Sequence, residues 1–171
     1  MPSTIVVDTS VLIDLARGGL VESALALPYE FVVPRLLLDV EVDPGQAEYL
    51  LSRGLRTVDL DGDVVSVAAA YLERTAAISM VDAFVLALAR TSGAMLLTGD
   101  GPLRTLATSE GVDTHGLLWL LDRLEQSGTV GLPTLHSSLL SVVGNSRCRL
   151  PRDQVRVRLA RYARATGSRP E

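Results

Sequence analysis

The chain alternates short runs of β-branched and aliphatic residues with segments in which apolar residues recur at helical spacing. This alternation predicts strands that pair in parallel within a sheet covered by helices. The predicted strands are residues 4–7, 31–33, 56–60, 94–98 and 112–115. The predicted helices are residues 11–15, 36 onward, 64–74, 79–91, 103–110 and 117–126.

These elements predict an α/β fold with three layers, α/β/α, around a central parallel sheet of four to five strands. In the helix that follows Pro34, the residues Leu36, Leu37 and Val40 are expected to share an apolar face. In open parallel sheets, ligands bind in the crevice outside the carboxyl ends of the strands. We therefore expect polar residues that follow strands to form the ligand-binding site.

Beyond Gly128 the pattern changes to two helical segments, residues 132–143 and 151–165, with no strand between them. We expect a domain over residues 1–127 and a C-terminal helical extension over residues 128–171. In the last helix an apolar stripe lies beside a row of arginines. The stripe is Val155, Leu159 and Tyr162, and the row is Arg158, Arg161 and Arg164. In one interpretation, the helix packs on the domain through its apolar stripe and the arginines are solvated or paired with acids. In the other, the arginines contact phosphate groups of a nucleic acid. We favour the first.

The composition indicates one ordinary folded domain. Of the 171 residues, 47% are hydrophobic, which is enough for a sizeable core. The start of the chain lacks the pattern of a signal peptide, and no apolar run approaches the ~20 residues that span a bilayer. Cys148 is the single cysteine, which excludes an internal disulfide. Together these features predict a cytoplasmic protein that does not associate with membranes.

The net charge of −4 conceals an uneven distribution. Residues 1–146 carry 8 arginines and 18 acidic residues, whereas residues 147–171 carry 8 arginines and 2 acidic residues. An acidic body is an unusual surface for a nucleic-acid-binding protein, unless several of its acids converge to hold divalent cations.

Three aspartates stand at the ends of predicted elements. Asp8 follows the first strand and Asp100 follows the strand at 94–98, and each is also a suitable helix N-cap. Asp82 lies three residues after Ser79, which is the spacing of a capping box, but it begins a highly apolar helix. All three could reach one crevice at the carboxyl edge of the sheet. Because like charges at short range repel, a divalent cation is the usual partner of such a cluster.

The segments around these aspartates resemble the motifs of PIN-domain proteins. Val-Asp-Thr-Ser-Val-Leu-Ile at 7–13 is similar to the opening motif, although Ser10 stands where the family often has Asn. Ser-Met-Val-Asp-Ala-Phe-Val-Leu-Ala-Leu-Ala at 79–89 resembles the helix of the third acid. Leu-Leu-Thr-Gly-Asp at 96–100 resembles the strand end of the fourth acid. The order and spacing of the motifs agree over residues 4–115.

The resemblance implies a metal-dependent ribonuclease, in particular a VapC-type toxin of a toxin–antitoxin pair. It implies Mg²⁺ or Mn²⁺ as cofactor, RNA as substrate, an antitoxin protein as partner, and a homodimer. Asp8, Asp82 and Asp100 would be the metal-binding acids, and the hydroxyls of Ser10 and Thr98 would orient them. The family's second acid falls at Asp39 or Glu41. Residues two apart do not share a helix face, so only one of this pair can point into the crevice.

Two other classes of function were weighed against the nuclease. A degenerate PIN fold that serves as a catalytically inactive binding or scaffold module stays open, because the second acid is ambiguous. A phosphoryl-transfer regulator with a similar acidic sheet edge would need a lysine on a later strand, and the chain has no lysine.

Overall fold

The computed structural model describes residues 1–166 and contains a five-stranded sheet in which every neighbouring pair of strands is parallel. The order across the sheet is β3-β2-β1-β4-β5. The strands are β1 (Ser3–Val7), β2 (Tyr29–Pro34), β3 (Arg56–Val58), β4 (Met95–Leu97) and β5 (Thr114–His115). Each coincides with a predicted strand, so the predicted α/β class and parallel sheet are confirmed.

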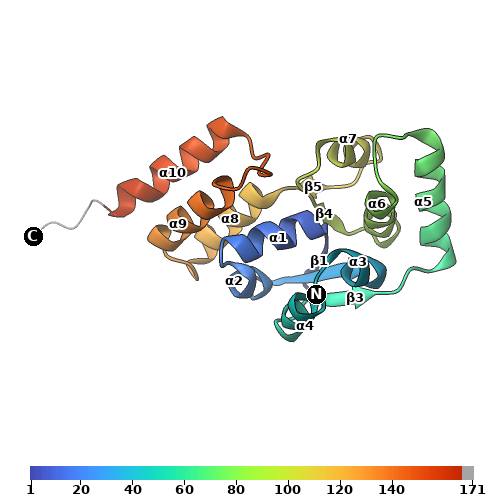
Figure 1. Cartoon of the computed structure of the whole chain (residues 1–171), viewed down its shortest axis with the longest axis horizontal. Coiled ribbons are helices and arrows are strands. Elements are labelled where there is room, and N and C mark those ends of the chain that lie inside the picture. Colours follow the sequence, from blue (N-terminus) through green and yellow to red (C-terminus); the bar gives the residue numbers. More distant parts are fainter. Residues whose placement is uncertain (167–171) are drawn as a thin grey trace, which may run out of the picture.

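Helices fill the connections between the strands and the C-terminal part of the described chain. They are α1 (Thr9–Arg17), α2 (Val21–Leu25), α3 (Arg35–Glu41), α4 (Pro44–Ser52), α5 (Gly62–Arg74), α6 (Met80–Ser92), α7 (Gly101–Ser109), α8 (Leu117–Ser127), α9 (Leu132–Val143) and α10 (Arg152–Thr166). Figure 1 shows α6, with α5 and α7 beside it, on one side of the strands and α1, α2, α8 and α9 on the other. This arrangement is the expected three-layer α/β/α architecture.

The strands are apolar because helices cover both faces of the sheet. Ile5, Val6 and Val7 are fully buried in β1, and Leu96 and Leu97 are fully buried in β4. These two strands are neighbours, with Val7 opposite Leu97. The polar residues that follow them therefore emerge side by side at the carboxyl edge of the sheet.

Helix α2 was not predicted from the pattern, and α4 was not distinguished from the helix predicted from residue 36 onward. The five residues of α2 are too few for a helical period to be recognised. In α4 only Leu50 is buried, so the helix has no apolar stripe of its own. Its start is visible only in its capping, since Asp43 accepts hydrogen bonds from the backbone N–H groups of Gly45 and Gln46 and Pro44 occupies the first turn.

The predicted apolar face of α3 is wrong. Leu37 and Leu38 are buried, whereas Leu36 and Val40 are 44% and 67% exposed. The buried stripe runs instead from Leu38 to Val42, one helical turn later. With leucines at three successive positions, sequence spacing does not determine the rotation of a seven-residue helix. The contacts of α3 with β2, β3 and α1 determine it.

The C-terminal helices pack on the sheet domain. Helix α9 contacts α1 and α8, and α10 lies along α9. Tyr162 is fully buried and Val155 is nearly so, with Leu159 partly buried between them. The apolar stripe of the last helix is therefore a docking face, as favoured from the sequence. The division of the chain at residue 128 stays a prediction.

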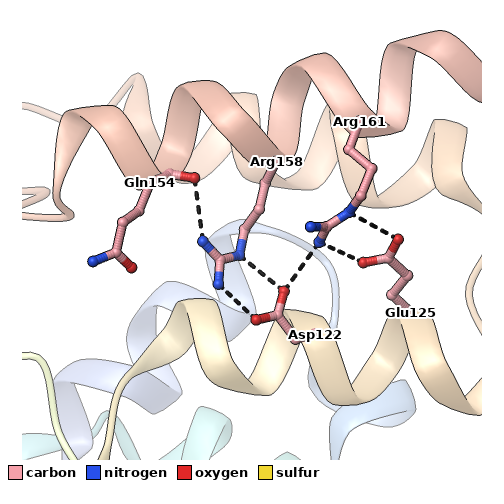
Figure 2. Close-up of polar contacts among 5 residues, drawn as sticks. All are labelled: Asp122, Glu125, Gln154, Arg158 and Arg161. Atoms are coloured by element: carbon pink, nitrogen blue, oxygen red, sulfur yellow. Dashed lines mark hydrogen bonds and ion pairs between the residues drawn. The ribbon is translucent and has the colours of Figure 1, made fainter.

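Two arginines of α10 are bound to acids of α8 (Figure 2). Arg158 donates from Nε and Nη2 to the two carboxylate oxygens of Asp122, at 2.9 and 2.6 Å. Arg161 forms the same kind of fork with Glu125, at 3.0 and 2.6 Å, and also reaches Asp122 at 3.1 Å. Such bidentate pairs fix the orientation of both groups, so they align α10 with α8.

Within residues 1–166, no helix combines the length and the apolar character needed to cross a lipid bilayer.

Candidate active site

A cleft opens at the carboxyl edge of the sheet, beside the ends of β1 and β4. From β1 the chain continues toward β2 on one side, and from β4 it continues toward β5 on the other. This is the topological switch point at which α/β sheets bind ligands. The cleft has a volume of 870 Å³, and five acidic residues line it. They are Asp14 of α1, which is paired with Arg17, and four acids from separate parts of the fold: Asp8, Glu41, Asp82 and Asp100.

Asp8 is the most buried of these acids, with only 5% of its surface exposed. Its backbone N–H continues the ladder by donating to the Leu97 carbonyl at 2.9 Å. Its Oδ2 accepts hydrogen bonds from the hydroxyls of Thr98, at 2.7 Å, and Ser10, at 2.9 Å. Burial raises the pKa of the Asp8 carboxyl, while the two hydroxyl donors oppose the rise and the charge of Asp82 adds to it.

Thr98 connects the two aspartates that follow β1 and β4. Its hydroxyl donates to Asp8 and accepts from the backbone N–H of Asp100 at 3.1 Å. The side chain is fully buried. Its backbone is held on both sides, because its N–H donates to the His115 carbonyl at 2.9 Å and its carbonyl accepts from Arg104 Nη2 at 2.9 Å. The hydroxyls of Thr98 and Ser10 both contact Asp8, as expected from the motifs.

Asp100 is the N-cap of α7. Its Oδ1 accepts the backbone N–H of Leu103 at 2.8 Å, and Pro102 occupies the first turn of the helix. Asp82 is the third residue of a capping box, in which its Oδ2 accepts from the Ser79 N–H at 2.8 Å while the Ser79 hydroxyl accepts from the Asp82 N–H at 3.1 Å. Both acids cap helices and line the cleft, so the two interpretations of each residue are compatible.

The structure separates Asp39 from Glu41. Glu41 is the last residue of α3 and lines the cleft, and its Oε2 accepts a short hydrogen bond from the Thr9 hydroxyl. Asp39 is exposed and is not among the residues that line the cleft. Thr9 was not identified from the sequence, because a threonine beside a motif aspartate carries no signal of a contact 32 positions away.

Each cleft acid is bonded mainly through one oxygen. The bonds reach Asp8 Oδ2, Glu41 Oε2, Asp82 Oδ2 and Asp100 Oδ1. Among the described residues, the second oxygen accepts nothing in Glu41, Asp82 and Asp100, and in Asp8 it has only a 3.5 Å contact with the Ser10 N–H. In the same part of the chain, none of the four forms an ion pair.

This donor set suits a hard divalent cation in its chemistry, because Mg²⁺ prefers carboxylate oxygens and usually takes only one or two of them. The four carboxylates are, however, spaced more widely than the ligands of a compact metal centre. Over residues 1–166, no group of three or more His, Cys, Asp and Glu side chains is close enough to hold a metal ion. The four acids therefore share a cleft without forming a closed coordination shell.

Three further residues of the cleft were not identified as site residues from the sequence. Asp14 of α1 lines the cleft, but it is bonded to Arg17 at 3.2 Å; burial raises its carboxyl pKa, which the arginine opposes. Arg147 and Arg149 also line the cleft. They belong to the segment between α9 and α10, which is far along the chain from the motif residues. The uneven charge of the chain indicated a basic C-terminal part but not its position.

Comparison with known proteins agrees with this geometry. One solved structure with the same fold is a PilT N-terminus domain protein, SSO1118, from the hyperthermophilic archaeon Sulfolobus solfataricus P2. It superposes with a TM-score of 0.50 at 17% sequence identity, covering 71% of this chain and 92% of that one. No curated protein sequence matches the chain significantly. The model of the DUF3368 family, described as a PIN domain, matches residues 4–164. The chain therefore belongs to the PIN-domain family.

Proposed function

We propose that this protein is a metal-dependent ribonuclease that hydrolyses RNA phosphodiester bonds in the cleft at the end of β1 and β4. The observation that carries the proposal is the convergence of Asp8, Glu41, Asp82 and Asp100, each bonded mainly through one oxygen. Within residues 1–166 the other oxygen has no donor, or in Asp8 only the 3.5 Å contact of the Ser10 N–H. Acids whose only purpose is helix capping need not meet in one cleft. PIN-family membership supports the same reaction class.

Asp8 and Asp100 are proposed as the residues that bind Mg²⁺ or Mn²⁺ directly, with Asp82 and Glu41 binding a second ion or orienting the attacking water. When bound, the cation would supply the Lewis acidity that activates water and offsets the charge of the phosphate. Thr98 and Ser10 favour the ionised form of Asp8 and orient it by donating to Oδ2, so that Oδ1 keeps only the 3.5 Å contact with the Ser10 N–H. Glu41, rather than Asp39, is the proposed second acid.

The decisive experiment is RNA cleavage by purified variants in Mn²⁺ and in EDTA. Asp8→Asn, Asp82→Asn and Asp100→Asn should each lower turnover by about 100-fold or more, because asparagine keeps the cap but removes the charge that a metal ligand requires. The parent protein should be inactive in EDTA. If all three variants cleave as the parent does, the activity belongs to a contaminant or to another site.

Asp39 and Glu41 provide a matched pair of controls on one helix. Glu41→Gln should lose most of the activity, whereas Asp39→Asn should cleave as the parent does. Both variants lose one negative charge from α3, so a difference between them reports on position in the cleft and not on net charge. Equal activities of the two variants would exclude Glu41 as the second acid.

We also propose, from the motif resemblance, that the protein is a VapC-type toxin that acts in the cytoplasm, forms a homodimer and is restrained by an antitoxin. Expression in a bacterial host should then arrest growth, and Asp100→Asn should relieve the arrest at equal protein level. A parent that folds and binds RNA but cleaves none, with Mg²⁺ or Mn²⁺ present, would instead favour a catalytically inactive binding module.

A further inference from the structure

The segment between α9 and α10 places two arginines in the wall of the acidic cleft. Arg147, Arg149 and Leu150 line the same 870 Å³ cleft as Asp8, Glu41, Asp82 and Asp100. The arginines are more than 45 residues beyond the last motif acid, Asp100, and belong to the basic end of the chain. The fold thus brings part of the basic C-terminal region to the acidic cleft.

The segment has a defined conformation. Asn145 starts a turn, in which its side-chain oxygen accepts the Arg147 N–H at 2.9 Å and its carbonyl accepts the Cys148 N–H at 3.0 Å. Cys148 and Leu150 are partly buried and pack against the core, while Arg147 and Arg149 are exposed. The apolar side chains thus anchor the segment, and the two arginine side chains stay exposed.

The two guanidinium groups of this segment differ from those of α10. Arg158 and Arg161 are held by Asp122 and Glu125 (Figure 2). In residues 1–166, no carboxylate forms an ion pair with Arg147 or Arg149, and neither guanidinium donates a hydrogen bond within that range. Their five N–H donors each are available to a ligand in the cleft.

A polyanionic substrate needs such groups here. Four carboxylates repel a phosphodiester chain, and cations bound among them would compensate this repulsion only locally. Guanidinium groups bind phosphate oxygens in bidentate fashion and are always charged. We propose that Arg147 and Arg149 bind the phosphate backbone of the RNA strand beside the acids and so position it for cleavage; this inference rests on the nuclease function proposed above.

Phosphate contacts position a strand but do not read its bases. Arg147 and Arg149 are therefore positioning residues that contribute binding without sequence preference. Arg158 and Arg161 act less directly, because their pairs with Asp122 and Glu125 of α8 fix α10, the helix into which the segment leads. This division assigns separate roles to the arginines of the basic C-terminal part.

Binding can be tested without cleavage by using a short, fluorescein-labelled single-stranded RNA with phosphorothioate linkages, in Mn²⁺, over a range of salt concentrations. Arg147→Gln/Arg149→Gln should bind roughly tenfold more weakly than the parent. The slope of log K against log salt should fall by about 1.4, because each lost phosphate contact in a single strand accounts for about 0.7. Arg152→Gln/Arg156→Gln is the matched control, since it removes the same charge from exposed residues that do not line the cleft.

Cleavage kinetics separate positioning from other roles. The Arg147→Gln/Arg149→Gln variant should show a raised KM with kcat little changed, as expected when binding is lost equally from the ground state and the transition state. Binding and KM equal to those of the matched control would overturn the inference. Faster cleavage by the variant would also overturn it, because the arginines would then obstruct the cleft.

The two proposals fail in different ways. If the parent binds RNA in an arginine-dependent manner but does not cleave it, the nuclease function is wrong and the binding surface stands. If the parent cleaves RNA while the arginine variant matches its control, only the inference about Arg147 and Arg149 is wrong. Thermal melts of every variant verify that these exposed substitutions leave the fold intact.

Discussion

Two regions of this molecule are rich in carboxylates, and they differ in how the carboxylate oxygens are hydrogen-bonded. At the interface of α8 and α10, Asp122 and Glu125 are each held through both oxygens by arginines. In the cleft, Asp8, Glu41, Asp82 and Asp100 are held mainly through one oxygen, by hydroxyl or backbone donors, and form no ion pair among the described residues. A carboxylate that is paired through both oxygens can orient a helix, whereas one that is bonded through a single oxygen still has the other oxygen to offer to a ligand.

The largest effect expected from this comparison is at Thr98, the residue that orients Asp8 and Asp100. Thr98→Val keeps the shape of a fully buried side chain and removes its donor and acceptor. Metal affinity and RNA cleavage should both fall by about 10–100-fold, as for other groups that orient metal ligands. Thr108→Val, whose hydroxyl donates to the Arg104 carbonyl on an exposed helix face, is the control and should cleave normally. Parent-like activity of Thr98→Val would show that Asp8 needs no orienting donor.

Asp122→Asn should produce the opposite result, a loss of stability without a loss of catalysis. Arg158 and Asp122 have side chains that are 14% and 26% exposed, so their pair lies between the exposed and buried classes. We expect unfolding free energy to fall by about 2 kcal/mol, and Tm by about 4–8 °C. Turnover per folded molecule should be unchanged at low temperature. A folded variant that loses activity would show that α10 docking controls the cleft.

Mn²⁺ should stabilise the parent protein through the cleft acids. At a concentration ten times its Kd, binding to the folded state alone adds about 1.4 kcal/mol, which corresponds to a rise in Tm of about 3–5 °C. Asp100→Asn should lose most of this rise, and Asp122→Asn should keep it. Melts at matched ionic strength measure the effect. An equal rise in both variants would place the metal elsewhere.

The smallest effect concerns the pH dependence of metal-free stability. The pKa of Asp8 is raised in the folded protein, mainly by burial, so its carboxyl is destabilising when ionised. Stability from this group is present below its unfolded pKa of 3.8 and is lost as pH rises through the higher folded pKa. Asp8→Asn should therefore gain stability relative to the parent as pH rises through this range, and then stay at a constant advantage. An advantage that shrinks with rising pH would contradict the assigned cause.

Much of the fold could be predicted from the pattern of apolar residues. The five strands and the longer helices were found because buried parallel strands are continuous apolar runs and amphipathic helices repeat their apolar residues. The pattern missed the five-residue α2, did not separate α4 from α3, and misplaced the buried face of α3. In all three cases the local sequence is compatible with several arrangements, and contacts with distant elements select one.

The sequence alone determined which residues are available for chemistry and where they leave the sheet. Asp8 follows β1 directly and Asp100 follows β4 by three residues, so their meeting is a consequence of parallel pairing. Asp82 lies in the first turn of the helix that leads into β4. The tertiary structure alone shows that Glu41 lines the cleft and Asp39 does not, and it alone brings Arg147 and Arg149 to the same cleft. The physical reason is the difference in sequence range between local and tertiary interactions. Caps and periodicity act over a few residues, whereas the rotation of α3 and the path of the chain after α9 depend on packing between segments that the sequence order keeps far apart.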